Sequence, residues 1–198
     1  MKKLFLGIVA LMAAASMSAQ SAGEKFLKPM VGGTMSTITK ADNAKMRLGL
    51  VAGGELGYFM ADNLALTGGL LVSLQGANFD DTNYTRDMSS TMTYLNIPVL
   101  ANYYVAPGLA IKAGLQPGFL LANNDKGEYN NGGKWVEYDE SSTDGMKKFD
   151  LSIPIGLSYE ISDFVIDARY NFGVTKIAEH GDSKNSVIML TLGYKIPF

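Results

Sequence analysis

The chain offers few side chains suited to nucleophilic or acid–base chemistry. It has no cysteine, and its one histidine, His180, begins a His-Gly-Asp-Ser segment that ends at Ser183. A histidine beside a serine is the pair that many hydrolases use. A catalytic site also needs a third group that orients the histidine and a cleft for the substrate, and the pattern around His180 shows neither. We therefore expect a histidine on a surface loop, no catalytic residue and no enzyme activity.

Six charged residues lie within short, otherwise apolar segments of the chain. They are Glu55, Lys112, Glu160, Asp167, Arg169 and Lys195. Side chains on a β-strand alternate between two faces, so each of these charges would lie on the face opposite its apolar neighbours. Three members are acidic and three are basic. Such a set can neutralise itself if the strands bring its members together.

Segment 122–147 combines acidic residues with aromatic ones and has the chemistry of a binding surface. Its carboxylates could hold a divalent cation, but their spacing does not follow a dedicated calcium loop, so we expect a solvated loop and no metal site. Tyr129, Trp135 and Tyr138 are interspersed among the charges. Functional contacts concentrate on loops, so these three residues mark a candidate partner-binding loop.

The elements that must position these residues are short strands. Apolar and polar residues alternate in eight segments, which are 28–37, 47–59, 64–76, 91–105, 109–121, 148–160, 164–176 and 186–198. Tight turns at 60–63, 106–108 and 161–163 alternate with the longer polar connections 38–46, 77–90, 122–147 and 177–185. Short turns at one end and long loops at the other are typical of membrane barrels. The sequence predicts an all-β fold, an eight-stranded antiparallel up-and-down transmembrane β-barrel.

The face that each strand turns outward supports this fold. In the last seven segments one face carries apolar or small residues without any charge, as in Leu48, Leu50 and Leu56 of the second segment. A charge on that face would cost about 2–4 kcal/mol at the middle of a bilayer. The first segment has no clear register, and we leave its faces unassigned.

The six recurring charges then point into the barrel, in the half nearer the short turns. A barrel of eight strands is only wide enough for side chains to fill it. We expect a salt-bridged, non-conducting interior with Arg169 near its centre. The alternative is a gated polar pathway, which a steady single-channel conductance would reveal.

The N-terminus predicts export. Lys2 and Lys3 precede the apolar run 4–15, and small and polar residues follow as far as Ala22. This is the pattern of a secretory signal peptide, residues 1–22, cleaved near 19–22. Residues 23–198 then form one domain. The net charge of −2 does not suggest a nucleic-acid partner, and no cofactor motif is present.

The C-terminus has the pattern of an assembly signal. Thr191 and Gly193 are followed by Ile196 and the terminal Phe198 in the lipid-facing register. This pattern is similar to the signal by which the barrel-assembly machinery recognises its clients. We therefore expect that machinery as a partner during insertion, with outer-membrane lipids around the finished barrel in the Gram-negative envelope.

Four stretches together resemble an outer-membrane β-barrel family of Bacteroidetes that includes PorT-like proteins. They are 94–104 (YLNIPVLANYY), 114–118 (GLQPG), 149–156 (FDLSIPIG) and 167–173 (DARYNFG). The resemblance spans the mature chain and implies the fold and an outer-membrane location. It implies no activity, because a fold alone does not supply one. Two roles stay open: a structural or interaction barrel with long external loops, and a PorT-like accessory of transport or protein secretion that docks with envelope or secretion proteins.

Overall fold

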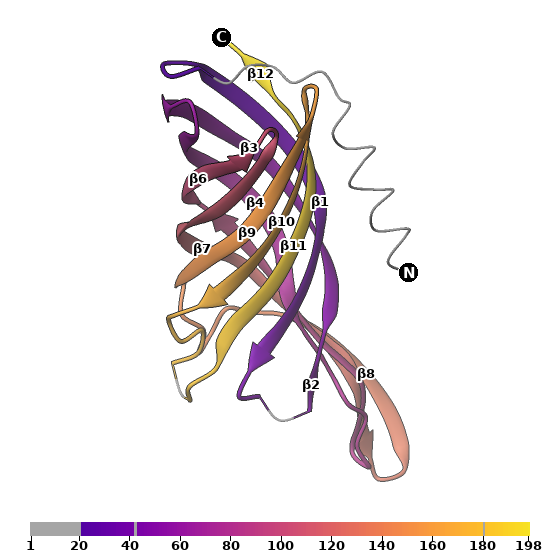
Figure 1. The fold of residues 1–198 in the computed structure, drawn as a ribbon. Helices are drawn as coiled ribbons and strands as arrows, with labels where there is room; N and C mark the ends of the chain where they lie inside the picture. The colour runs from indigo at the N-terminus through magenta and orange to yellow at the C-terminus, as the bar shows by residue number, and fades with distance from the viewer. Residues whose placement is uncertain (1–20, 42, 180) are drawn as a thin grey trace.

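The computed structural model describes residues 21–41, 43–179 and 181–198 as a closed β-barrel (Figure 1). Its wall consists of eight antiparallel strands that follow one another around the ring in chain order, and one of them is made of two consecutive elements. They are β1 (Lys25–Thr39), β3 (Arg47–Ala61), β4 (Leu64–Phe79), β5 (Thr85–Asn96) continued by β6 (Val99–Ala106), β7 (Leu109–Asn131), β9 (Phe149–Ile161), β10 (Phe164–Gly173) and β11 (Lys184–Tyr194). Among the described residues, no helix is long and apolar enough to cross a membrane.

The ring closes where the last long strand meets the first. β11 pairs with β1 from Met30 opposite Gly193 to Thr39 opposite Lys184. The short β12 (Ile196–Pro197) extends this seam by pairing with Phe26 and Leu27. Closure leaves no free edge along the wall, as a strand surrounded by lipid requires. The predicted eight-stranded barrel is therefore confirmed.

The predicted alternation of short and long connections is also confirmed. At one end, which we call the short-turn end, residues 62–63, 107–108 and 162–163 join successive strands. Pro107 and Gly108 suit the two central positions of a type II turn, and Gly108 has the positive φ, 73°, that the second of them needs. The opposite end, the long-loop end, carries the longer connections and the protruding β8 (Lys134–Ser141).

The outside of the barrel is apolar, whereas its inside holds the buried charged and polar side chains together with small apolar clusters. Leu48 and Leu50 are 75% and 66% exposed, whereas Glu55 on the same strand is 0% exposed. The same division holds on every strand whose register the sequence assigned. Lipid is the only environment that matches such a surface over the width of a membrane, because water would leave large apolar side chains unburied.

The register of the first strand comes from its neighbours. Pairing of β1 with β3 and β11 turns Leu27, Val31 and Met35 outward. Phe26, Lys28, Met30 and Thr34 therefore point into the barrel and are buried. The strand also begins at Lys25, three residues before the predicted segment. The inward position of Lys28 changes the charge balance of the interior.

The interpretation of 122–147 as a loop is wrong for most of its length. β7 continues without interruption to Asn131, turns at Gly132 and Gly133, and returns as β8. Part of 77–90 is likewise strand, because β4 extends to Phe79 and β5 begins at Thr85. Most side chains of these extensions are at least partly exposed on either face, so the extensions lack the apolar alternation that reveals a half-buried strand.

Candidate functional site: the interior charge network and the protruding arm

Five buried charged side chains meet inside the barrel and form what we call the central network. They are Lys28, Glu55, Lys112, Asp167 and Arg169. Glu55 lies between two cations, with Lys28 Nζ 2.7 Å from one carboxylate oxygen and Arg169 Nη2 2.5 Å from the other. Arg169 Nε donates to Asp167 at 2.7 Å, and Lys112 also pairs with Asp167. The network thus joins four strands by charge-assisted contacts.

Inward glycines make room for these long side chains. A Cβ on Gly69 would lie 2.7 Å from Cγ of Glu55, and one on Gly193 would lie 2.9 Å from Cγ of Lys28. A Cβ on Gly156 would lie 3.0 Å from Cγ of Arg169. The stems of the charged residues therefore lie over glycines of the neighbouring strands.

A second ionic group, the lower group, lies nearer the short-turn end. Lys195 Nζ is 3.3 Å from Oε2 of Glu160 and 3.9 Å from Oε1 of Glu24. The Tyr104 hydroxyl donates a 2.5 Å hydrogen bond to Oε1 of Glu160. Glu160 is thereby held by a cation and a phenol from opposite parts of the wall.

Aromatic rings fill the space beside the lower group. The ring of Phe59 is 5.7 Å from that of Phe26 and 5.4 Å from that of Tyr104, measured between centroids. Lys195 Nζ lies 4.8 Å and 4.7 Å above the Phe26 and Phe59 rings. A cation held over desolvated rings is attracted to both of them. This aromatic cluster lies in the interior at the short-turn end.

All six charges predicted to point inward lie inside the barrel. Glu55, Lys112, Asp167 and Arg169 join the central network, whereas Glu160 and Lys195 belong to the lower group. Arg169 contacts both carboxylates of the central network.

Two ionic residues were missed, Lys28 and Glu24. With Lys28 the central network has three cations and two carboxylates, so it is not neutral by itself. The lower group has one cation and two carboxylates, which offsets the excess cation of the central network, and the buried Asp150 adds one further carboxylate nearer the long-loop end. Only the register of β1 identifies Lys28 as inward, and Glu24 precedes the predicted first strand.

A different apolar cluster lies at the long-loop end of the interior. Ile177, from the connection after β10, is 2% exposed and packs with Met92, Tyr94 and Leu120. Asp150 holds the start of this connection, because its carboxylate accepts a hydrogen bond from the Thr175 hydroxyl at 2.7 Å. The same carboxylate accepts a second hydrogen bond from the Asn185 amide at 2.9 Å. The predicted seventh strand segment, 164–176, is therefore shorter, because the chain leaves the wall after Gly173 and enters the barrel mouth.

Three strand segments extend past the barrel rim and form what we call the arm. They are residues 85–91 of β5, 122–131 of β7, and β8 (Figure 1). Gly132 and Gly133 have φ of 61° and 89°, the left-handed values of a tight hairpin turn. On one face the Arg86 guanidinium lies 4.0 Å above the Trp135 ring, and on the other Tyr129 contacts Tyr138. The three aromatic residues of the candidate binding loop thus lie on two faces of the arm.

The arm carries an excess of acidic residues in an unusual arrangement. Asp125 lies directly opposite Glu140, and Glu128 directly opposite Glu137. Among residues 21–41, 43–179 and 181–198, no cationic side chain pairs with these four carboxylates. Like charges at directly opposite positions destabilise a sheet. The register places Arg86 of β5 directly opposite Glu128, so a cation lies beside one of the two repulsive pairs, whereas Asp125 of the other pair has Ser90 at the corresponding position.

One acidic residue of the arm is paired. Lys126 Nζ lies 2.8 Å from Oδ2 of Asp139, and the Asn124 amide donates to Oδ1 at 2.7 Å. The hydrogen bond from Lys126, followed by that from Asn124, holds the pKa of Asp139 below its ordinary value. The Tyr138 pKa is raised by partial burial and by the nearby Asp125 and Glu140 carboxylates.

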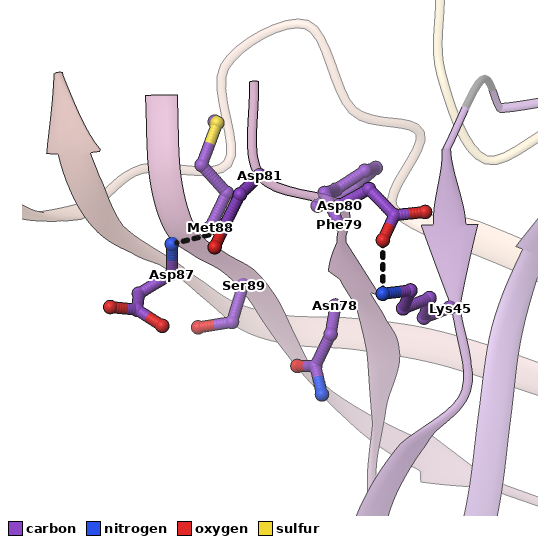
Figure 2. Close-up of a pocket in the computed structure, with 8 residues that line it drawn as sticks. All are labelled: Lys45, Asn78, Phe79, Asp80, Asp81, Asp87, Met88 and Ser89. Carbon is purple, nitrogen blue, oxygen red and sulfur yellow. Dashed lines mark hydrogen bonds and ion pairs between the residues drawn. The ribbon is translucent and has the colours of Figure 1, made fainter. Parts of the chain in front are cut away.

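A polar pocket lies at the base of the arm, and Figure 2 shows the side chains that line it. Its volume is about 580 Å³. Lys45 reaches across it to pair with Asp80, which raises the Lys45 pKa, while the Asp87 backbone amide donates to Asp81 at 2.9 Å. The described residues contain no cluster of three metal-ligating side chains, here or elsewhere. The pocket is polar and open, with its carboxylates partly engaged by the protein itself.

The residues of the predicted assembly signal lie along the seam. Thr191 and Gly193 point inward, whereas Ile196 and Phe198 are exposed on the outer face. His180, Asp42 and residues 1–20 of the predicted signal peptide lie outside the described residues, and Ser183 lies at the long-loop end.

Solved structures of other proteins resemble this chain. Ail, the attachment invasion locus protein of Yersinia pestis, aligns with 88% of this chain and 99% of its own at 18% identity and a TM-score of 0.50. Neisserial surface protein A aligns with 87% of this chain and 97% of its own at 11% identity and a TM-score of 0.49. No significant match is found among curated proteins. At such identities a likeness concerns the fold alone.

A family model gives the firmer assignment. The model of the outer membrane protein beta-barrel domain matches residues 13–179, which is most of the chain. The match agrees with the apolar outer wall, the closed ring and the short turns at one end. The long-loop end is accordingly the extracellular end, as in other outer-membrane barrels. This chain belongs to the outer membrane protein beta-barrel domain family and resides in the outer membrane.

Proposed function

We propose that this protein is a non-conducting barrel that presents its arm to a partner outside the cell. The observation that carries the proposal is the arm itself, a three-stranded sheet that leaves the wall and exposes aromatic and unneutralised acidic residues. A barrel that only needed to sit in the membrane would end its strands at the rim. Building the arm orders about two dozen residues, a cost in entropy that a binding role accounts for.

The contents of the interior support a closed barrel. Between the two ends lie the Ile177 cluster, the central network, the lower group and the aromatic cluster around Phe59. The charges of the central network are engaged with each other, so an ion crossing this region would have to break pairs in a low-dielectric surrounding. The proposal assigns these charges a structural role and no catalytic one.

Conductance tests the closed interior. Purified wild-type protein in planar bilayers should give no steady single-channel conductance, with folding verified by heat-modifiable mobility on gels. A variant that combines Ile177→Ala with Phe59→Ala, one substitution in each of the two clusters, serves as a positive control and should conduct intermittently. A steady conductance from the wild-type protein would overturn the closed barrel in favour of a polar pathway.

Crosslinking in cells tests the role of the arm. A tagged protein is compared with a variant in which two glycines replace residues 126–139, so that the hairpin is cut back to the rim. We expect one extracellular partner to crosslink at fixed stoichiometry to the full protein and not to the shortened one. A partner that crosslinks equally to both proteins contradicts the role of the arm. If that partner is a secretion component, the PorT-like accessory role becomes the better description.

The C-terminal residues support a proposal about assembly. Phe198 is 73% exposed, and Ile196 is on the same outer face, so both are accessible to the barrel-assembly machinery before the seam closes. Replacing Phe198 with serine should lower the amount of folded protein in the outer membrane while leaving the unfolding of the assembled fraction unchanged. Unchanged insertion of this variant would remove Phe198 from the signal.

A further inference from the structure

We propose that the outer edge of β8 binds an extended, basic polypeptide segment, which adds to the arm as a fourth strand. This inference rests on the proposed function, because it names the chemistry of the partner that the arm contacts and the way it binds. It comes from three observations: a free strand edge, unneutralised carboxylates beside that edge, and one aromatic side chain on each face of β8.

The edge of β8 is open to pairing. β7 is flanked by β5 on one side and by β8 on the other, and in the described part of the chain β8 pairs with β7 alone. Proteins usually protect such an edge with a bulge, a proline or charged residues, lysine above all. The register of β8 has no irregularity, the strand contains no proline, and its one lysine, Lys134, is at its end. Its outward backbone groups can therefore take another strand.

The charge beside this edge selects the partner. Glu137 and Glu140 are on β8 itself, each directly opposite another carboxylate on β7, and neither has a cationic partner in the described chain. They point to opposite faces of the sheet. A strand that carries lysine or arginine next to them would replace repulsion by the opposite-charge pairing that stabilises neighbouring strands. An acidic strand would add to the repulsion.

The aromatic residues define the contacts between the charges. Trp135 and Tyr138 are half-buried and point to opposite faces, where Trp135 lies under Arg86 and Tyr138 contacts Tyr129. Each ring therefore keeps part of its surface exposed on one face of β8. Cross-strand pairs of aromatic and β-branched residues are favourable. The preferred segment is therefore extended and alternates basic with β-branched residues, so that backbone bonding gives affinity and side chains give selectivity.

The experiment uses the full protein in lipid nanodiscs and a peptide of alternating lysine and valine as long as β8, which has 8 residues. Trp135 is the chain's single tryptophan, so its fluorescence reports directly from the edge. The peptide should change this fluorescence saturably. A peptide with glutamate in place of lysine should not bind. A lysine–valine peptide methylated on every backbone nitrogen keeps the charge but cannot donate hydrogen bonds, and it should not bind either.

Two double variants test the carboxylates. Glu137→Gln with Glu140→Gln should weaken binding of the basic peptide by up to about fivefold, because the lysines of an alternating peptide all lie on one face and form a cross-strand pair with one of the two carboxylates, whichever face they take. Asp144→Asn with Glu179→Gln removes the same charge from exposed positions outside the arm and should leave binding unchanged. Equal weakening by both double variants would mean a general attraction to an acidic surface and would overturn the assignment to β8.

The remaining outcomes are equally decisive. Equal binding of the methylated peptide excludes strand addition, and failure of the basic peptide to bind excludes the basic partner. Association of the protein with itself through β8, seen as a mass increase with concentration, would make a second copy the occupant and overturn the proposal. These failures differ from a failure of the proposed function, which would appear as an unchanged crosslinked partner in the shortened protein.

Discussion

The interior of the barrel and the arm contain the same kinds of charged side chain in opposite surroundings. Glu55 is completely buried and forms ion pairs with Arg169 at 2.5 Å and Lys28 at 2.7 Å. Asp139 accepts one lysine at 2.8 Å, and both partners are more than half exposed. In the interior an unpaired charge is costly, so pairing there constrains the fold. On the arm water replaces any lost partner, so pairing contributes little and unpaired acids can persist for binding.

The two regions also differ in what holds their strands together. Inside the barrel, a glycine on one strand leaves space for a long side chain of the neighbouring strand, as Gly69 does for Glu55. In the arm, strands are joined by backbone bonding and by surface contacts such as Arg86 on Trp135. The interior thus tolerates little change in volume, whereas the arm tolerates changes in its side chains.

The largest expected effect separates the two regions directly. Glu55→Gln removes the shared partner of Lys28 and Arg169 and leaves three buried cations with one carboxylate, which should cost about 3–5 kcal/mol. Asp139→Asn removes a carboxylate from the exposed pair and should not change global stability measurably. Urea unfolding of both variants in lipid vesicles measures the difference. Similar stabilities of the two variants would contradict the distinction between buried and exposed pairs.

Two adjacent glycines sharpen the comparison between inside and outside. Gly69→Ala places a Cβ 2.7 Å from the Glu55 side chain and 2.8 Å from a backbone oxygen, and should destabilise the barrel by about 1–3 kcal/mol. Gly68 points outward with nothing within 4 Å of its added Cβ, so Gly68→Ala should leave unfolding unchanged. The same urea titration measures both variants. If Gly68→Ala were the more damaging substitution, the assigned faces of β4 would be wrong.

The smallest effect concerns the titration of the arm. Because Lys126 and Asn124 depress the pKa of Asp139, the contribution of this pair is fully present above the ordinary aspartate pKa and is lost as the pH falls through the depressed value. Carboxyl NMR should place the Asp139 pKa below that of an unpaired aspartate, near 3.9. Lys126→Gln should bring it closer to that value. An unchanged pKa in this variant would show that the pair does not persist in solution.

The lipid-facing positions were predictable because their rule is local. Seven strands keep apolar residues at every second position, as Leu48 and Leu50 do, and the barrel presents those faces to lipid. The first strand did not follow this rule clearly, because its inward face mixes Lys28 with the apolar Met30, while Leu27 and Val31 share the outward face. The two glycines that follow Val31 have no side chain and add nothing to either pattern. The arm did not follow the rule because most side chains on either of its faces are at least partly exposed, so neither face needs to be apolar.

By itself, the sequence determined the fold class, the strand order, the outer face of seven strands and the inward direction of six charges. Alternation at period two and the cost of charge in lipid suffice for these features. The tertiary structure alone decided which charges meet, as for Glu55 and Arg169, and that Lys28 joins them. It also decided that β8 has a free edge. Ion pairs and free edges depend on the register and closure of strands far apart in the chain, and no local pattern records them.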